Sequence, residues 1–184
     1  MSISIFIFRR DFRIIDNTSL QLLLKSKDKI LPIFIFNKKQ IDRNINKYYS
    51  ENCVEFMFQS LKEVSPINYY YTTNDDITIL NELKRKFNIG TIAFNKDYTP
   101  FAINRDNIII DWCNKNKIIC YKKEDYVLYD ILNGQTKKKD GNPYQVFTPF
   151  KNFCMNNLKV KEIDSFKNFK FHNILFYQEN NVHF

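Results

Sequence analysis

The sequence has only three glycines, at positions 90, 134 and 141 of its 184 residues. The phosphate-binding loops of dinucleotide-binding folds and of P-loop enzymes need several glycines close together, so neither loop is present. The two histidines, His172 and His183, both lie near the C-terminus. The preceding part of the chain therefore has no histidine-centred catalytic triad and no histidine metal cluster.

Cysteine motifs and long apolar runs are also scarce. The four cysteines, at positions 53, 113, 120 and 154, form no C-x-x-C motif, so we expect free thiols in a reducing compartment. No run reaches the roughly 18 uncharged apolar residues of a membrane helix. Residues 1–8 have no basic stretch before their apolar run and are predicted to form a strand, not a signal peptide. We expect a cytoplasmic or nuclear, DNA-associated protein with no membrane partner.

Basic residues are plentiful, but most of them are lysines. The 28 Lys and Arg outnumber the 20 Asp and Glu, which gives a net charge of +8. The abundant Lys, Asn, Ile, Phe and Tyr all have AT-rich codons, so a solvated basic surface that reflects genome bias explains this charge better than a dedicated DNA-binding face does. Arginines are less evenly spread, because Arg9, Arg10 and Arg13 lie together. This cluster indicates positions that need a planar, bidentate guanidinium.

Apolar runs alternate with helical patterns up to residue 121. The predicted strands span residues 3–8, 30–36, 67–71, 91–94 and 117–121. Helices are predicted between them, one stopping at Gly90 and the last spanning residues 103–115. This order predicts an α/β fold: a three-layer, doubly wound, Rossmann-like domain with a five-stranded, mainly parallel sheet. We assign residues 1–155 to this domain and residues 156–184 to a strap or to the start of an interdomain linker.

Ligands of such sheets bind at the carboxyl ends of the strands, where the strand order reverses. The segments that leave these ends begin at Arg9, Asn37, Thr72 and Asn95. Because these segments contain no glycine, a ligand would be held by side chains more than by the backbone. Turns are expected at Asn133–Gly134 and at Asp140–Gly141.

Four blocks of sequence point to one protein family. Residues 6–20 read FIFRRDFRIIDNTSL, residues 32–36 read PIFIF, residues 94–106 read FNKDYTPFAINRD, and residues 140–151 read DGNPYQVFTPFK. In order and spacing, these blocks resemble the N-terminal domain of DNA photolyases and cryptochromes. The family's opening signature is W-F-R-R-D-L-R-x-x-D-N-x-x-L, and its last block closes the domain. We therefore expect an antenna-type α/β domain, with residues 140–150 as a structural seam.

The resemblance implies that the functions of the family are divided between two domains. Family members continue into an all-helical domain that binds FAD and the DNA lesion, so we expect no FAD and no repair by this chain alone. It would be half of a split protein or a truncated product, acting as a photolyase only when a separately encoded FAD-binding half completes it. DNA would be bound through that complex, or weakly through the basic surface. The alternative is a free-standing nucleotide-binding or partner-recruiting regulatory domain.

The resemblance also implies an antenna chromophore at the strand ends. The candidate residues are Arg10, Phe36, Asn37, Asn95, Asp97 and Arg105. Phe36 would offer an aromatic face, while Asn95 and Asp97 would bond to a ring edge. Folate-binding members carry an Asn-Glu pair where this chain has Phe101 and Ala102, so folate is disfavoured against a deazaflavin or flavin-like ring.

The same residues also have a structural interpretation. Arg10 and Asp11 leave one strand end, and Arg105 and Asp106 lie in a later helix. Reciprocal Arg–carboxylate pairs between these two segments would fix their geometry. Trp112 is expected to belong to the core. We predict no catalytic residue and no metal site.

Overall fold

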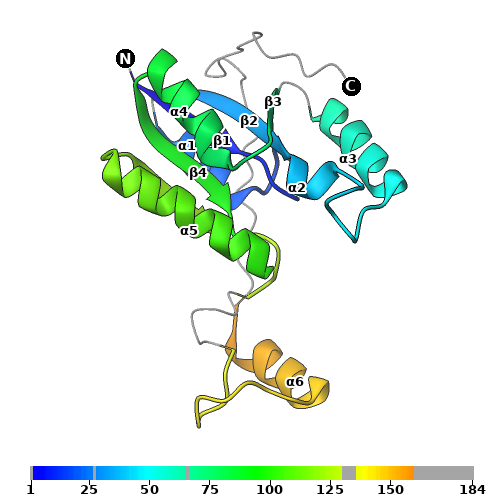
Figure 1. Cartoon of the computed structure of the whole chain (residues 1–184). Coiled ribbons are helices and arrows are strands. Elements are labelled where there is room, and N and C mark those ends of the chain that lie inside the picture. The colour runs from blue at the N-terminus through cyan, green and yellow to red at the C-terminus, as the bar shows by residue number, and fades with distance from the viewer. Residues whose placement is uncertain (1, 27, 65–66, 130–135, 160–184) are drawn as a thin grey trace.

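A computed structural model describes residues 2–26, 28–64, 67–129 and 136–159 (Figure 1). The strands are β1 (Ile3–Ile7), β2 (Lys29–Asn37), β3 (Asn68–Thr72), β4 (Ile89–Asn95) and β5 (Ile119–Lys123). They form one sheet in the order β3-β2-β1-β4-β5, and each neighbouring pair is parallel. The chain order therefore reverses at β1, which confirms the doubly wound α/β prediction. The turn predicted at Asn133–Gly134, and residues 160–184 of the predicted strap or linker, lie outside the described residues.

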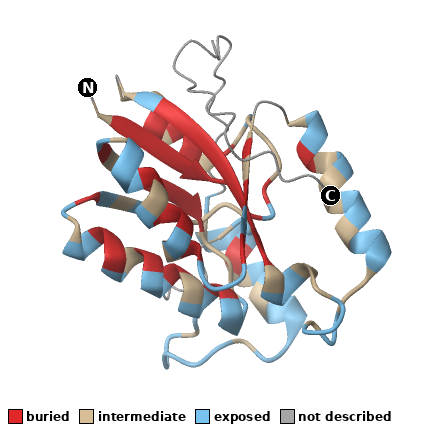
Figure 2. Ribbon diagram, turned by 45° about the horizontal axis from the view of Figure 1, so that its top comes forward, coloured by how far each residue is buried: buried red, intermediate tan, exposed pale blue. Residues whose placement is uncertain are grey.

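Helices cover both faces of the sheet. They are α1 (Thr18–Leu24), α2 (Lys38–Ile41), α3 (Glu51–Glu63), α4 (Asp76–Lys86), α5 (Pro100–Lys115) and α6 (Phe147–Asn157). The isoleucines of β1 pack with α4 and α5 on one face, while Phe6 and Phe8 pack with α1 and α3 on the other. Figure 2 shows the resulting buried sheet between helices whose outer sides are exposed. Burial of each such side chain contributes roughly 1.5–3 kcal/mol, so these two clusters fix the three layers.

Polar side chains cap two of the helices at their N-termini. The Asn17 side chain accepts a hydrogen bond from the backbone N–H of Leu20 at the start of α1. The Asp75 carboxylate accepts from the N–H groups of Ile77 and Thr78 at the start of α4. Both satisfy donors that the first turn of a helix leaves unpaired.

Most element boundaries differ from the predictions by a few residues, and two of these differences have a clear physical cause. Gly90 does not stop α4, which ends at Lys86; it lies within β4, where an added Cβ would come 3.3 Å from Ser2 Cβ. This glycine therefore serves a close approach of the N-terminal segment. The last strand begins at Ile119 and not at Lys117, because Lys117 has a left-handed φ of 58° and completes the turn after α5.

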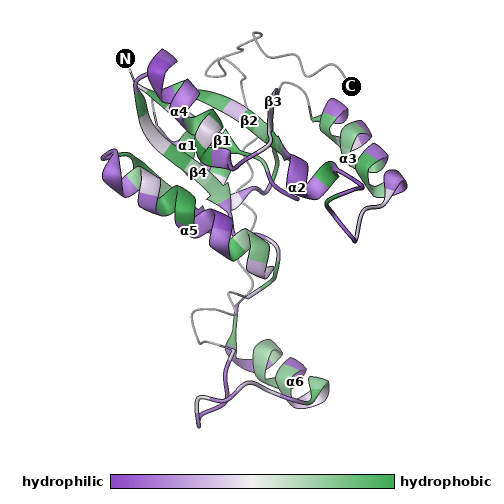
Figure 3. Ribbon diagram, viewed as in Figure 1, coloured by the Kyte–Doolittle hydropathy of each residue, from purple (hydrophilic) through white to green (hydrophobic). Residues whose placement is uncertain are grey.

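The region after β5 holds a helix that the sequence patterns did not predict. The turn expected at Asp140–Gly141 is present, and Gly141 has a φ of +81°. The expected seam then becomes helical at Phe147, the start of α6. Figure 3 shows apolar and polar residues interspersed along α6, and its apolar Phe147 and Met155 are 73% and 69% exposed. Among the described residues, no helix is long and apolar enough to cross a membrane.

Candidate functional site

A buried hydrogen-bond network, formed by Asp11, Asn17, Ser19 and Asn95, joins the β1–α1 loop to the end of β4. Asn95 donates to the Asp11 carboxylate and, at 2.9 Å, to Asn17 Oδ1. It also accepts from the Ser19 N–H at 3.1 Å. Asn17 donates to Asp11 Oδ2 at 3.1 Å. We call these four residues the loop network; they fix the loop at the point where the strand order reverses.

Asp11 is the charged member of the loop network and is almost fully buried. Burial raises its pKa above the ordinary value of 3.8, although the Arg9 N–H and the Asn95 amide donate to it and partly oppose this shift. A buried carboxylate surrounded by donors holds a backbone loop well but is shielded from a ligand.

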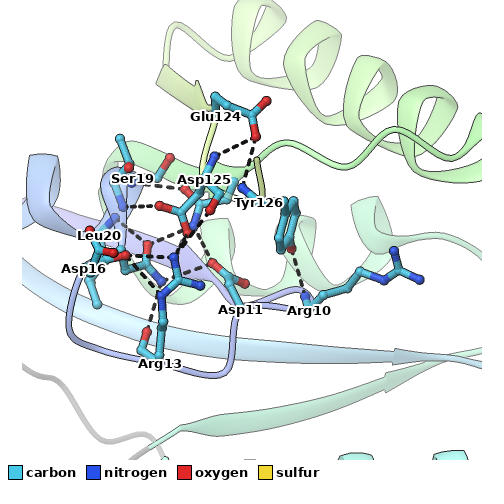
Figure 4. Close-up of polar contacts among 12 residues, drawn as sticks. Arg10, Asp11, Arg13, Asp16, Ser19, Leu20, Glu124, Asp125 and Tyr126 are labelled. Carbon is cyan, nitrogen blue, oxygen red and sulfur yellow. Dashed lines mark hydrogen bonds and ion pairs between the residues drawn. The ribbon is translucent and has the colours of Figure 1, made fainter. Parts of the chain in front are cut away.

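A second set of contacts joins the same loop to the exit segment, which we define as Glu124–Tyr126 after β5 (Figure 4). The Asp125 carboxylate pairs with Arg13 at 2.5 Å and accepts from the Thr18 N–H at 2.8 Å. The Tyr126 hydroxyl accepts from the Arg10 N–H at 3.0 Å. No motif marks these residues in the sequence; only their place after a strand end could have suggested them.

Four charged residues, of which Arg9, Asp76 and Asp106 are buried and Arg105 is partly buried, lie where α4 and α5 meet the strand ends. Arg9 pairs with Asp76 at 3.0 Å, with only 6% and 3% of the two side chains exposed. Arg105 pairs with its neighbour Asp106 at 2.9 Å. Burial, together with the nearby Arg9 charge, lowers the pKa of Arg105, whereas burial raises the pKa of Asp106. We call this set the charge quartet.

The quartet corrects the predicted pairing of arginines. Arg105 bonds within its own helix and not to the β1 loop, and Arg9 is the buried arginine of that loop. The side chain of Arg10 is 70% exposed, and its Nε lies 3.8 Å from Asp97 Oδ2. In Figure 4 this side chain points away from the other labelled residues. The sequence could not distinguish the two adjacent arginines, because a strand end does not reveal which side chain turns inward.

A pocket with a cavity volume of about 70 Å³, partly open to solvent, lies beside the charge quartet. Its walls are Asn37 at the end of β2, Lys39 of α2, Asn74–Ile77 around the start of α4, and Phe101, Asn104, Arg105, Ile108 and Ile109 of α5. Phe101 is 41% exposed, and the Arg105 guanidinium lies 6.0 Å from the centre of its ring. The pocket thus combines an aromatic face with amide and guanidinium groups, as sites for flat heteroaromatic ligands do.

The structure divides the six predicted site residues. Asn37 and Arg105 line this pocket. Phe36 is 2% exposed and stacks on Phe58 at 4.7 Å, so it offers no face to a cleft; it is a core residue. Asn95 is fully buried in the loop network, and Asp97 accepts from the Thr99 N–H ahead of α5.

Sequence comparison with known families decides the assignment. A family model described as DNA photolyase matches residues 4–168. The chain belongs to the DNA photolyase family. Its fold is that of the family's N-terminal domain, so the expected resemblance is confirmed.

Several photolyases resemble this chain over most of its length. The deoxyribodipyrimidine photo-lyase of Buchnera aphidicola subsp. Baizongia pistaciae is 29% identical over 168 residues, which are 87% of this chain and 35% of that protein. The crystal structure of the photolyase of Sulfolobus tokodaii, described with two FAD molecules, matches with a TM-score of 0.72 and 34% identity, over 87% of this chain and 36% of that one. A Synechocystis cryptochrome, 14% identical with a TM-score of 0.73 over 88% of this chain and 35% of that one, shares the fold. This photolyase-family chain thus spans about a third of the length of its relatives.

Proposed function

We propose that this domain binds a flavin or deazaflavin antenna chromophore in the pocket between β2, α4 and α5. The observation that carries the proposal is the joint presence of Phe101, Arg105 and the Asn37 and Asn104 amides around one opening. An amide carries both a donor and an acceptor, which suits the mixed edge of a flavin-type ring. The bound ring would supply absorption of light. The chain's own residues would hold and orient that ring and keep water from one of its faces.

Two further observations support a flavin-type ring over folate. Phe101 brings a hydrocarbon face where folate-binding members of the family carry a polar pair, so the pocket suits stacking better than a pterin's hydrogen bonds. The Sulfolobus tokodaii structure is described as implying a novel light-harvesting cofactor, and it holds two FAD molecules.

The light-dependent chemistry requires a second component. We propose that a separately encoded, FAD-binding helical half completes the protein, and that DNA repair and DNA binding occur in that complex inside the cell. The domain spans about a third of its relatives. The apolar side chains of Val146, Phe147 and Met155 at α6 are also 63–73% exposed, as expected of a surface that a partner covers.

Titration of the purified chain with a deazaflavin, FMN, FAD and methenyl-folate, followed by fluorescence anisotropy, tests the antenna proposal. We expect binding of a flavin-type ring and a loss of about fivefold in affinity for Phe101→Ala, because a stacked aromatic contact contributes on the order of 1 kcal/mol. Ile103→Ala is the matched control, since Ile103 lies on the same helix with 40% exposure but does not line the pocket. Equal losses in both variants, or preferential binding of folate, would contradict the proposal.

Co-expression with a candidate FAD-binding protein tests the partner proposal separately. We expect the two chains to co-purify, and Phe147→Asp together with Met155→Asp to abolish the complex without changing chromophore binding. A complex unaffected by both substitutions would place the partner elsewhere on the surface.

A further inference from the structure

The walls of the pocket between β2, α4 and α5 carry two cations, Lys39 and Arg105. The Arg105 guanidinium donates to Asp106 Oδ1 from Nε at 3.1 Å and from Nη2 at 2.9 Å, so its charge is balanced within α5. The Lys39 side chain is exposed, and its ammonium group forms no ion pair with any residue that the structure describes. Lys39 is therefore the wall cation that remains available to a ligand.

The two carboxylates of the wall already have donors of their own. Asp76 Oδ2 pairs with Arg9 Nη1 at 3.0 Å. Asp75 Oδ1 accepts from two backbone N–H groups at the start of α4, at 3.1 Å and 3.3 Å. Because these donors disperse the two negative charges, the unpaired ammonium group of Lys39 favours an anionic group at its own end of the pocket.

One buried amide fixes the backbone of Lys39 beside the pocket. Asn37 is 5% exposed; its Oδ1 accepts from the Lys39 N–H at 2.9 Å, and its Nδ2 donates to the Asn74 carbonyl at 3.4 Å. This side chain thereby ties the end of β2 to the segment ahead of α4, and both segments form walls of the pocket. The fold thus holds the base of the Lys39 side chain in place, while the exposed end can reach a ligand.

We propose that the ligand of this pocket is a phosphorylated flavin, and that Lys39 binds its phosphate and determines this specificity. The inference rests on the proposed antenna function. A phosphate monoester carries nearly two negative charges at neutral pH, and a lysine ammonium binds phosphate as a compact point charge. The ring would stack on Phe101 of α5, and the sugar-alcohol chain would lead to Lys39 on the opposite wall. Riboflavin offers the same ring without the charge, so Lys39 would distinguish the two forms.

The affinities of riboflavin and FMN, measured by fluorescence anisotropy, test the inference on the whole chain. We expect the wild type to bind FMN about tenfold more tightly than riboflavin, because a charge-assisted contact is added. Lys39→Gln should remove this difference and leave the affinity for riboflavin unchanged. Lys38→Gln is the matched control, since Lys38 precedes Lys39 on α2 but pairs with Asp42 at 3.7 Å and does not line the pocket.

Competition experiments identify the source of the phosphate. Inorganic phosphate in excess should weaken binding of FMN to the wild type but not to Lys39→Gln, and should not affect riboflavin. AMP carries the same phosphate monoester on a different ring and should compete no better than inorganic phosphate. Competition by AMP as strong as that by FMN itself would overturn the assignment to a flavin.

The riboflavin measurement separates this inference from the antenna proposal. Equal binding of riboflavin and FMN by the wild type would overturn the role of Lys39 and leave the antenna proposal intact. Equal losses of FMN affinity in Lys38→Gln and Lys39→Gln would also overturn it, because they would show a general effect of surface charge. Binding of neither flavin would overturn both proposals.

Discussion

The Arg9–Asp76 pair of the charge quartet allows a sharp test of how buried charge stabilises this domain. Both side chains are nearly inaccessible, and their atoms Nη1 and Oδ2 lie 3.0 Å apart. The other two guanidinium nitrogens of Arg9, Nε and Nη2, have no hydrogen-bond partner among the described residues. Desolvation of Arg9 is therefore only partly compensated by contacts.

Removal of Asp76 should lower the free energy of unfolding more than removal of Arg9. Asp76→Leu leaves Arg9 and Arg105 near each other with Asp106 as the remaining carboxylate of the quartet, and a guanidinium does not release its proton. We expect Asp76→Leu to cost roughly 3–5 kcal/mol, which is a fall of about 10 °C in melting temperature. Arg9→Met leaves Asp76 close to Arg105 and free to take up a proton, so its cost should be about 2 kcal/mol.

The double variant, Arg9→Met with Asp76→Leu, removes both charges and should lose only about 1 kcal/mol relative to wild type. Urea unfolding followed by circular dichroism gives all four free energies and hence the coupling energy. The matched control is the more exposed Lys38–Asp42 pair, whose atoms lie 3.7 Å apart and whose coupling should be below about 0.5 kcal/mol. A coupling for Arg9 and Asp76 as small as that of the control would refute the reasoning.

Three further predictions concern the loops around the pocket. Asp125→Ala removes both hydrogen bonds of the exit segment's buried carboxylate and should cost about 2 kcal/mol in urea unfolding; an unchanged unfolding midpoint would contradict this. Arg10→Lys should leave the melting temperature unchanged, because the Arg10 side chain is 70% exposed. Arg105→Lys should lower the melting temperature by several degrees, because lysine cannot replace the two guanidinium hydrogen bonds to Asp106. Equal changes in melting temperature for the two variants would contradict this prediction. Burial raises the pKa of Asp11 above 3.8, so its stabilising contribution is complete below that pH and is lost as the pH rises through the folded-state pKa. The free energy of unfolding of wild type minus that of Asp11→Asn should accordingly fall between pH 4 and pH 7, and a rise would exclude the assignment.

The sheet was predictable from the sequence because each strand is a short apolar run bounded by polar residues. The runs around Ile5, Ile33 and Ile92 are buried on both faces, and such runs identify parallel strands without reference to distant contacts. The backbone conformation of individual turn residues was harder to predict from the sequence. The left-handed φ of Lys117, which delays β5, has no glycine to signal it.

The site was predictable where a residue ends its own strand, as Asn37 does, or lies in a recognisable family block, as Arg105 does. Asn37 was identified because it ends β2. Asp76 and Asp125 were missed because their partners, Arg9 and Arg13, lie 67 and 112 residues away in the chain. Nothing in the local sequence distinguishes such carboxylates from ordinary helix-start or loop residues; only the completed topology brings the charges together.

The buried loop network has a consequence for how such a domain can diverge. Asp11, Asn17 and Asn95 belong to the blocks that make the family recognisable, and all three are committed to holding one loop against β4. The pocket wall includes side chains that lie outside these blocks, such as Lys39 and the partly exposed Ile108. Ligand preference can therefore change by substitution at the wall while the scaffold and its signature persist. Two descendants of one ancestor can therefore share the whole loop network and still differ in the shape and polarity of this pocket.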